Sequence, residues 1–170
     1  AVVCMGASVG MAIGFDKADP EAHKHSVAVI GDSTFIHSGI TGLIDAVYNK
    51  SHITVVILDN RTTGMTGHQN HPATGKTIKN EPTYELDLEQ VCRAVGVPNV
   101  RTIDPNDLSA MEAALKEELA KEEVSVIIAK RPCVLLTKKL YNGFRVNEKC
   151  KKCKACLKLG CPAIETAGGA

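Results

Sequence analysis

Two apolar runs, each ending in a polar turn, constrain the fold of this 170-residue chain more than any other feature. The first run, Ser26–Ile30, ends in the Gly-Asp-Ser turn Gly31–Ser33, and the second, Ile53–Leu58, ends in Asp59-Asn60. Continuous apolar runs of this length are typical of strands buried on both faces of a parallel sheet. Such sheets bind ligands outside the carboxyl ends of their strands, so we expect the two turns to lie side by side at that edge.

The rest of the first 130 residues predicts alternating helices and strands. Helical spacing covers residues 34–50, 88–95 and 107–123, strands are predicted at 100–103 and 124–129, and residues 61–81 form a long loop without periodicity. The last helix should turn five side chains inward: Leu108, Met111, Ala114, Leu115 and Leu119. Ala1–Met5 is interpreted as a strand. Because the chain has no initiator methionine, we expect it to be a piece of a longer protein. The alternation predicts an α/β fold, a parallel sheet with helices on both faces.

The first turn suits a phosphate group. Gly31 permits a tight turn and a close approach of the backbone. The backbone N–H groups of Ser33 and Thr34, at the start of a helix, favour an anion. A Gly-Asp-Ser turn by itself would more simply cap a helix. The second turn, after a second buried strand, is what favours a binding site.

The two turns together suit magnesium. Mg²⁺ prefers octahedral oxygen ligands at about 2.1 Å, from a few carboxylates, substrate phosphates and water. Asp32 and the amide oxygen of Asn60 can supply two of these ligands from adjacent strand ends, and the backbone carbonyl of Thr62 is the natural third. The sequence therefore predicts one ion that joins both turns to a diphosphate.

These motifs resemble the thiamine-diphosphate domain of the 2-oxoacid:ferredoxin oxidoreductases, and within that family the large (alpha) subunit of the indolepyruvate-oxidising branch. The resemblance rests on Gly31–Phe35, Leu58–Gln69, Pro72–Gly75, Cys4–Ala12 and Lys130–Val134, and it covers nearly the whole chain. Ser33 and Asp59 replace a glycine and the first of two asparagines that are usual in the wider thiamine family. We interpret both as marks of the ferredoxin-linked branch.

The resemblance implies a set of site residues. Asp32, Asn60 and Thr62 would bind Mg²⁺. The diphosphate and thiazolium of the cofactor would contact Gly31, Ser33, Thr34, Gly64, Met65 and Thr66, and Cys4, Met5 and Gly6 would lie near its aminopyrimidine. His68 and Gln69 are hypothesised to face the substrate keto acid, and no residue here is a certain catalytic group. The glutamate that thiamine enzymes place on the aminopyrimidine would come from another domain.

The remaining histidines give weaker signals. His68 and His71 form an H-x-x-H pair, but without a third ligand nearby we do not expect a metal ion there. His23 and His25 are expected to be solvated. Cys92, on a predicted helix, is expected to be a small buried apolar residue.

Four of the seven cysteines fall within twelve residues near the end, at positions 150, 153, 156 and 161. C-x2-C-x2-C followed by Cys-Pro is the bacterial ferredoxin pattern, so Cys150, Cys153 and Cys156 predict a 4Fe-4S cluster in a reducing cytoplasm. Cys161 follows after four residues rather than three, and either completes the same cluster or binds a second one. A structural zinc site is the alternative, although it usually shows two separated pairs.

These patterns divide the chain into three parts. Residues 1–131 are predicted to form the thiamine-diphosphate domain, 132–145 a linker, and 146–170 a truncated ferredoxin-type module.

Residues 1–129 hold 10 Lys/Arg against 17 Asp/Glu (net −7), whereas residues 130–158 hold 10 Lys/Arg against Glu148 alone (net +9). The basic segment is either a solvated tail or a docking surface for an acidic ferredoxin. Nucleic acid is disfavoured because only Tyr141 and Phe144 could stack on bases, and no apolar run is long enough for a membrane span.

The resemblance finally implies an activity. The chain would be part of an oxidoreductase that converts aryl 2-oxo acids such as indolepyruvate, with coenzyme A, into the aryl-acetyl-CoA and CO2. Electrons would pass to ferredoxin, and a smaller beta subunit would complete the enzyme. Two alternatives stay open: an oxidoreductase of the same family for pyruvate or 2-oxoglutarate, and a non-catalytic fragment whose tail transfers electrons or binds zinc.

Overall fold

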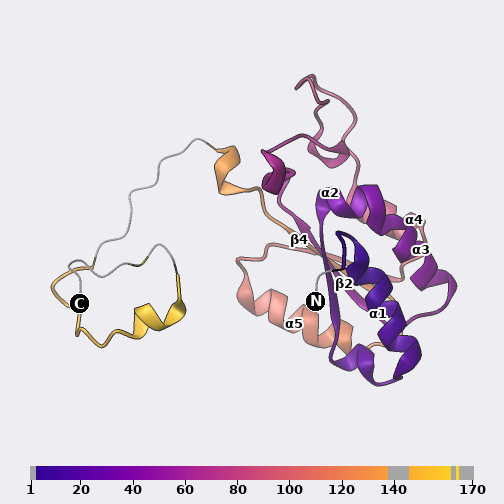
Figure 1. The fold of residues 1–170 in the computed structure, drawn as a ribbon, viewed down its shortest axis with the longest axis horizontal. Coiled ribbons are helices and arrows are strands. Elements are labelled where there is room, and N and C mark those ends of the chain that lie inside the picture. Colours follow the sequence, from indigo (N-terminus) through magenta and orange to yellow (C-terminus); the bar gives the residue numbers. More distant parts are fainter. Residues whose placement is uncertain (1–2, 138–145, 162–163, 165–170) are drawn as a thin grey trace. The chain divides into compact units, whose positions relative to one another are not determined.

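The computed structural model describes residues 3–137, 146–161 and 164, which fall into two units, Ala1–Thr137 and Lys138–Ala170 (Figure 1). The first unit holds all of the strands and the longer helices described. In the second, the structure describes one short 3-10 helix, Ala155–Leu159. Most of the predicted linker lies outside the described residues.

The first unit is built on a four-stranded sheet. Its strands are β1 (Val27–Gly31), β2 (Thr54–Asp59), β3 (Asn99–Ile103) and β4 (Ser125–Lys130). All neighbours are parallel, in the order β1-β2-β4-β3. The predicted parallel α/β sheet is therefore confirmed, and each of these four strands lies within one or two residues of a predicted strand.

Helices cover both faces of the sheet, as predicted. On one face, α1 (Ala7–Ala18), α3 (Ile40–Tyr48) and α4 (Leu88–Ala94) pack on a core that includes Val55 and Ile57 of β2. On the other face, α5 (Leu108–Leu119) packs through Ala114 against Val56 and Ile127. Burial of these apolar side chains is the main force that holds the layers together.

A continuous helical segment follows β1, where one long helix is predicted. A short α-helical turn, Asp32–Thr34 (α2), passes into a π-helical turn, Phe35–Gly39, and then into α3. Gly39 is needed at this point because a Cβ there would lie 2.7 Å from Ile30 Cδ1 and 2.9 Å from Phe35 Cδ2. The glycine thus lets the helix approach β1, and this approach fixes where the Gly-Asp-Ser turn lies.

The prediction of a strand at the start of the chain is wrong for the described part of that segment. Residues 3–6 form a turn, and α1 begins at Ala7 after Gly6, whose φ of 88° is left-handed. The helix contains two glycines and has little amphipathic pattern, so its own sequence signals it weakly. Packing of Val9 and Ala12 into the core stabilises it instead.

Two further predictions are corrected by the packing. Leu108 is 76% exposed, and α5 buries Glu118 (1% exposed) in place of a fully apolar face. Glu118 accepts hydrogen bonds from Ser125 Oγ and Lys121 Nζ, both at 2.7 Å, which offset the cost of its burial. His23 is buried, not solvated, because its turn (Ala22–Lys24) packs against α1. His25 is exposed and Cys92 is fully buried, as predicted.

Among the described residues, no helix has the length and apolar character that a bilayer crossing requires.

Candidate functional site

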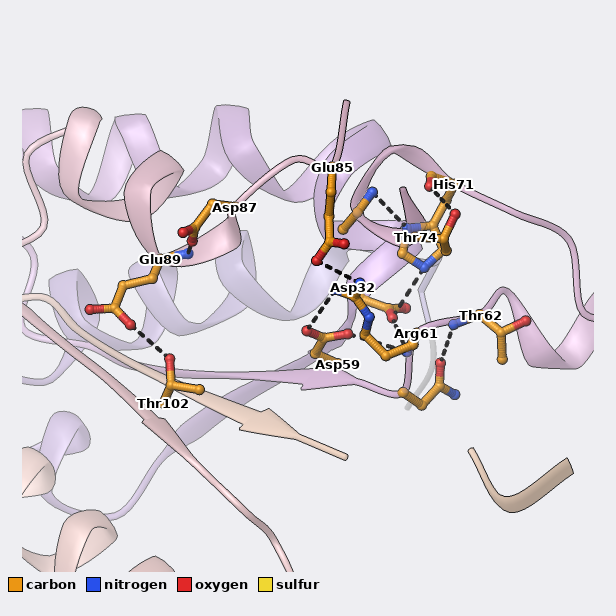
Figure 2. A network of polar contacts seen from close by, with 12 residues as sticks. Asp32, Asp59, Arg61, Thr62, His71, Thr74, Glu85, Asp87, Glu89 and Thr102 are labelled. Carbon is orange, nitrogen blue, oxygen red and sulfur yellow. Dashed lines mark hydrogen bonds and ion pairs between the residues drawn. The ribbon is translucent and has the colours of Figure 1, made fainter. Parts of the chain in front are cut away.

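The two predicted turns lie side by side at the carboxyl edge of the sheet. Gly31 of β1 is in register with Leu58 of β2, so the residues that follow each strand are neighbours. Asp32 and Asp59 are both buried there, at 3% and 2% exposure. Figure 2 shows their carboxylates at the centre of a network of polar contacts.

Asp32 is held by three groups from three segments. Its Oδ1 accepts the Ser33 N–H at 2.7 Å, its Oδ2 accepts the Arg61 N–H at 3.0 Å, and His71 Nε2 lies 3.2 Å from Oδ2. Burial by itself would raise the pKa of Asp32, but the His71 contact and the backbone N–H groups outweigh it and hold the pKa below its ordinary value. Asp32 is therefore a buried carboxylate that stays ionised.

The ring of His71 has a defined orientation in this contact. Its Nδ1 accepts the backbone N–H of Ala73 at 3.3 Å, so in the neutral ring the proton is on Nε2, the nitrogen that lies 3.2 Å from Asp32 Oδ2. The side chain is buried, and Thr74 Oγ1 donates to the His71 carbonyl at 2.8 Å. The long loop after β2 thus returns to support the first turn.

Asp59 has a different environment from Asp32. Its Oδ1 accepts the Arg61 N–H at 3.2 Å, and Arg61 Nη1 lies 3.9 Å from Oδ2, while the guanidinium pairs more closely with Glu85, at 2.6 Å. Burial, and then the nearby charge of Asp32, raise the pKa of Asp59, although Arg61 opposes them. The two neighbouring carboxylates are thus pushed apart in pKa, and Asp32 is the one that favours a cation.

Asn60 and Thr62 continue the second turn. Asn60 is exposed, and its Oδ1 accepts the Thr62 N–H at 3.1 Å. Its carbonyl accepts the Cys133 N–H at 2.9 Å, which ties the turn to the residues after β4. Thr62 is buried, and its Oγ1 has no hydrogen-bond partner among the described residues. The turns therefore offer an ionised carboxylate and an amide oxygen, two donors of the kind that suits a hard cation such as Mg²⁺.

One expectation about the phosphate contacts needs revision. The Ser33 N–H, expected to face an anion, donates to Asp32 Oδ1 instead. An added side chain at Gly31 would meet no atom within 4 Å, so the backbone there is open to an approaching group. The open surface at Gly31 thus supports the expected close approach better than the Ser33 amide does.

The segment Cys4–Gly6 lies beside the first turn, although 25 residues separate Gly6 from Gly31. A hollow of about 350 Å³ is lined by Cys4, Met5, Gly6, Gly31 and Thr34 together with apolar residues of α1 and β1. Gly6 lies against Ser38 and Thr34, so a side chain at this position would collide with the π-helical turn. The structure thus brings the residues proposed for the aminopyrimidine next to one side of the proposed diphosphate site.

The loop Gly64–Gln69 is less enclosed. Met65 is 92% exposed, and Thr66, His68 and Gln69 are exposed as well. Thr66 and Gln69 hydrogen-bond with each other, and Thr63 pairs with Gln69 in an isolated bridge. These side chains are free to face a ligand or another domain.

Several residues of the network were not among the predicted site residues, and His71, Arg61 and Glu85 are three of them. The sequence paired His71 with His68, but His68 is exposed whereas His71 is buried against Asp32. The contacts of His71, Arg61 and Glu85 depend on the path of the loop over residues 61–85, and the sequence of this loop has no periodic pattern. A buried role for His71 had no local signal apart from its place in a long loop, where functional residues are common.

The cysteines near the end of the chain are free and exposed. This holds for Cys150, Cys153, Cys156 and Cys161, and the lysines between them are exposed too. Their ligation stays a prediction.

Comparison with known proteins identifies one family. Residues 1–129 match the family described as thiamine pyrophosphate enzyme, C-terminal TPP binding domain. Curated relatives named indolepyruvate oxidoreductase subunit IorA are 40% identical over 95% of the chain in Archaeoglobus fulgidus and 39% identical over 99% of it in Methanothermobacter thermautotrophicus. The chain spans only 27% of the length of each of these relatives.

Solved structures share the fold at lower identity. The 2-oxoglutarate:ferredoxin oxidoreductase from Magnetococcus marinus superposes with a TM-score of 0.63 and 18% identity, over 72% of this chain and 44% of that one. A thiamine diphosphate-dependent 4-hydroxybenzoylformate decarboxylase from Rhodococcus jostii gives a TM-score of 0.53 and 22% identity, over 75% of this chain and 23% of that one.

Proposed function

The chain belongs to the thiamine pyrophosphate enzymes, as their C-terminal cofactor-binding domain, and from this premise we propose that it serves a 2-oxoacid:ferredoxin oxidoreductase. When bound, thiamine diphosphate supplies the nucleophilic carbon that attacks a 2-oxo acid and makes its decarboxylation possible. The work of this chain is then to hold the cofactor's diphosphate and metal ion at the edge of the sheet.

We assign the Mg²⁺ ligands to Asp32, the Asn60 amide oxygen and the Thr62 carbonyl. The observation on which this depends most is the buried, ionised carboxylate of Asp32 directly beside the Asn60 turn. Gly31, Ser33, Thr34, Gly64, Met65 and Thr66 would line the cofactor, with Cys4, Met5 and Gly6 toward its aminopyrimidine. His71 would be a positioning residue that acts through Asp32, because its Nε2 lies 3.2 Å from Asp32 Oδ2.

Asp32→Asn tests the assignment in the whole enzyme. The change keeps the shape of the side chain and removes the charge, so Mg²⁺-dependent affinity for thiamine diphosphate should fall by at least about tenfold, or 1.4 kcal/mol. Asp45→Asn, an exposed aspartate of α3, is the matched control and should bind as the unaltered chain does. Unchanged affinity in the Asp32 variant, measured by calorimetry, would contradict the site.

The favoured substrate is an aryl 2-oxo acid such as indolepyruvate, oxidised with coenzyme A to the aryl-acetyl-CoA and CO2. Support comes from the names of the relatives that match nearly the whole chain. Pyruvate and 2-oxoglutarate are the competing substrates, and a structural neighbour is named for the latter. Comparing kcat/KM for the three acids in the enzyme assembled with its smaller beta subunit would decide between them.

The tail would hold a 4Fe-4S cluster on Cys150, Cys153 and Cys156 and deliver electrons to ferredoxin, with Cys161 either as the fourth ligand or as a ligand of a second cluster. Four cysteines close together in the sequence and the exposed lysines between them support this proposal. Iron and acid-labile sulfide in the anaerobically purified protein are the expected result. Zinc alone would favour the alternative, a zinc-binding tail.

A further inference from the structure

Three side chains of metal-ligand type gather far from the candidate cofactor site. One ligand atom from each of Asp16, His23 and His52 lies within 4.8 Å of the others. Asp16 is in the last turn of α1, His23 is in the turn before β1, and His52 lies two residues before the start of β2. β1 and β2 start in register, so this cluster lies at the amino ends of the strands, whereas Asp32 lies at the carboxyl ends.

His23 presents a buried nitrogen that has no partner. Its Nδ1 lies 2.8 Å from the Pro20 carbonyl, which can only accept, so Nδ1 carries the proton and the neutral ring has its lone pair on Nε2. Nε2 is buried and makes no hydrogen bond to any described residue, in a side chain that is 4% exposed overall. Histidines that bind metal ions commonly donate their other ring N–H to a backbone carbonyl in this way.

Asp16 and His52 lie next to His23 in this cluster. Asp16 is 8% exposed, and its Oδ1 lies 3.8 Å from His52 Nδ1. The rings of His23 and His52 meet edge to face, with centroids 5.5 Å apart. Lys17 is a cation that also contacts Asp16. Its Nζ lies 3.4 Å from the other carboxylate oxygen, Oδ2, and donates to the Asn49 carbonyl at 2.9 Å. Oδ1 is therefore the Asp16 oxygen that lies toward His52.

We propose that Asp16, His23 and His52 bind a divalent transition-metal ion of the zinc class, through the carboxylate, Nε2 and Nδ1 respectively. Two imidazoles and one carboxylate form an accepted zinc ligand set that leaves the fourth position to water. Bonds of about 2.0–2.2 Å require the ligand atoms to close by roughly 1 Å, which the half-exposed ring of His52 can do by rotation. The ion would tie the connection between α1 and β1 to the start of β2.

Zinc itself tests the proposal on the full chain. After chelation and dialysis, bound zinc per chain is counted at increasing ZnCl2 for the unaltered chain and for His52→Gln and Asp16→Asn. Each variant should lose one equivalent or bind it at least about tenfold more weakly, because loss of even an outer partner typically costs about 10–100-fold. His25→Gln, an exposed histidine two residues from His23, is the matched control and should keep the full count. The tail cysteines are the same in every variant, so the zinc they bind cancels in the difference.

Two results would overturn the proposal: an equal zinc count and affinity in His52→Gln and the unaltered chain, or anomalous diffraction from zinc-soaked crystals with no peak between the three side chains. A peak there, with one equivalent lost in the variants, would support it. His23 is buried, so His23→Gln is the variant at greatest risk of misfolding. His52, whose side chain is 38% exposed, is the safer position, and its variant decides the question alone.

Discussion

His71 Nε2 lies 3.2 Å from Asp32 Oδ2, and both side chains are buried, although 39 residues separate them in the chain. The contact joins the long loop after β2 to the turn after β1. It also keeps a carboxylate ionised in a place where burial favours the neutral acid. The first prediction follows from it.

His71→Ala should make Mg²⁺-dependent binding of thiamine diphosphate more sensitive to acid. Burial raises the pKa of Asp32 and the His71 contact is the largest effect that lowers it, so the variant should have a higher Asp32 pKa. A carboxyl with a lowered folded-state pKa contributes stability that is present above its unfolded pKa and is lost as the pH falls through the folded value. In the variant this contribution to stability should be smaller, and protons should begin to compete with Mg²⁺ for Asp32 at a higher pH. Titrations with thiamine diphosphate and Mg²⁺ from about pH 8 down to pH 5 measure this shift, with His25→Ala as the control. Identical pH profiles for His71→Ala and the unaltered chain would refute the role of His71 in keeping Asp32 ionised.

Asp59→Asn should stabilise the folded chain near neutral pH. Burial and the charge of Asp32 raise the pKa of Asp59. A carboxyl with a raised folded-state pKa contributes stability below its unfolded pKa, and this stability is lost as the pH rises through the folded value. Asparagine cannot ionise, so the advantage of the variant in urea unfolding should be largest near neutral pH and shrink in acid. Lower stability than the unaltered chain at neutral pH would mean that the Arg61 contact outweighs the burial cost.

Gly39→Ala should destabilise the chain by about 1–3 kcal/mol, the usual cost of overpacking a core. The new methyl group would lie 2.7 Å from Ile30 and 2.9 Å from Phe35. Gly14→Ala in α1 is the matched control, because a Cβ there meets nothing within 4 Å, and the lower backbone entropy should stabilise that helix by about 0.5–1 kcal/mol. Chemical unfolding of both variants checks the opposite signs. Two changes of the same sign would show that the contact at Gly39 does not limit the packing.

Glu118→Gln should lower the free energy of unfolding by about 1–3 kcal/mol at neutral pH. Burial raises the pKa of Glu118, but hydrogen bonds from Lys121 and Ser125 outweigh it and lower the pKa overall, with an Arg101 ion pair at 2.7 Å in support. The stability from this lowered pKa is present above the unfolded pKa and disappears as the pH falls through the folded value, so the difference should shrink in acid. Glu117→Gln, an exposed partner of the same arginine, should cost at most about 1 kcal/mol. Equal costs for the two variants would contradict the importance of burial.

Patterns within single elements predicted much of this structure. The apolar runs that became β2 and β4 have the composition of buried strands, and the turn residues after β1 and β2 are local signals as well. The sequence could therefore place Asp32 and Asn60 together before any coordinates, because parallel strands put their carboxyl ends at one edge. Helix α1 was missed because its two glycines and weak amphipathic pattern leave its stability to packing.

What the sequence determined by itself is the alternation of strands and helices and the two turns that face each other, since both follow from residue type and short spacing. Only the tertiary structure decided that His71 supports Asp32, that α5 buries Glu118, and that Asp16, His23 and His52 share one point. Each of these contacts joins segments whose distance in space is set by the path of a loop or by the position of a helix on the sheet. Such paths depend on the whole packed core, and no spacing within a single element encodes them.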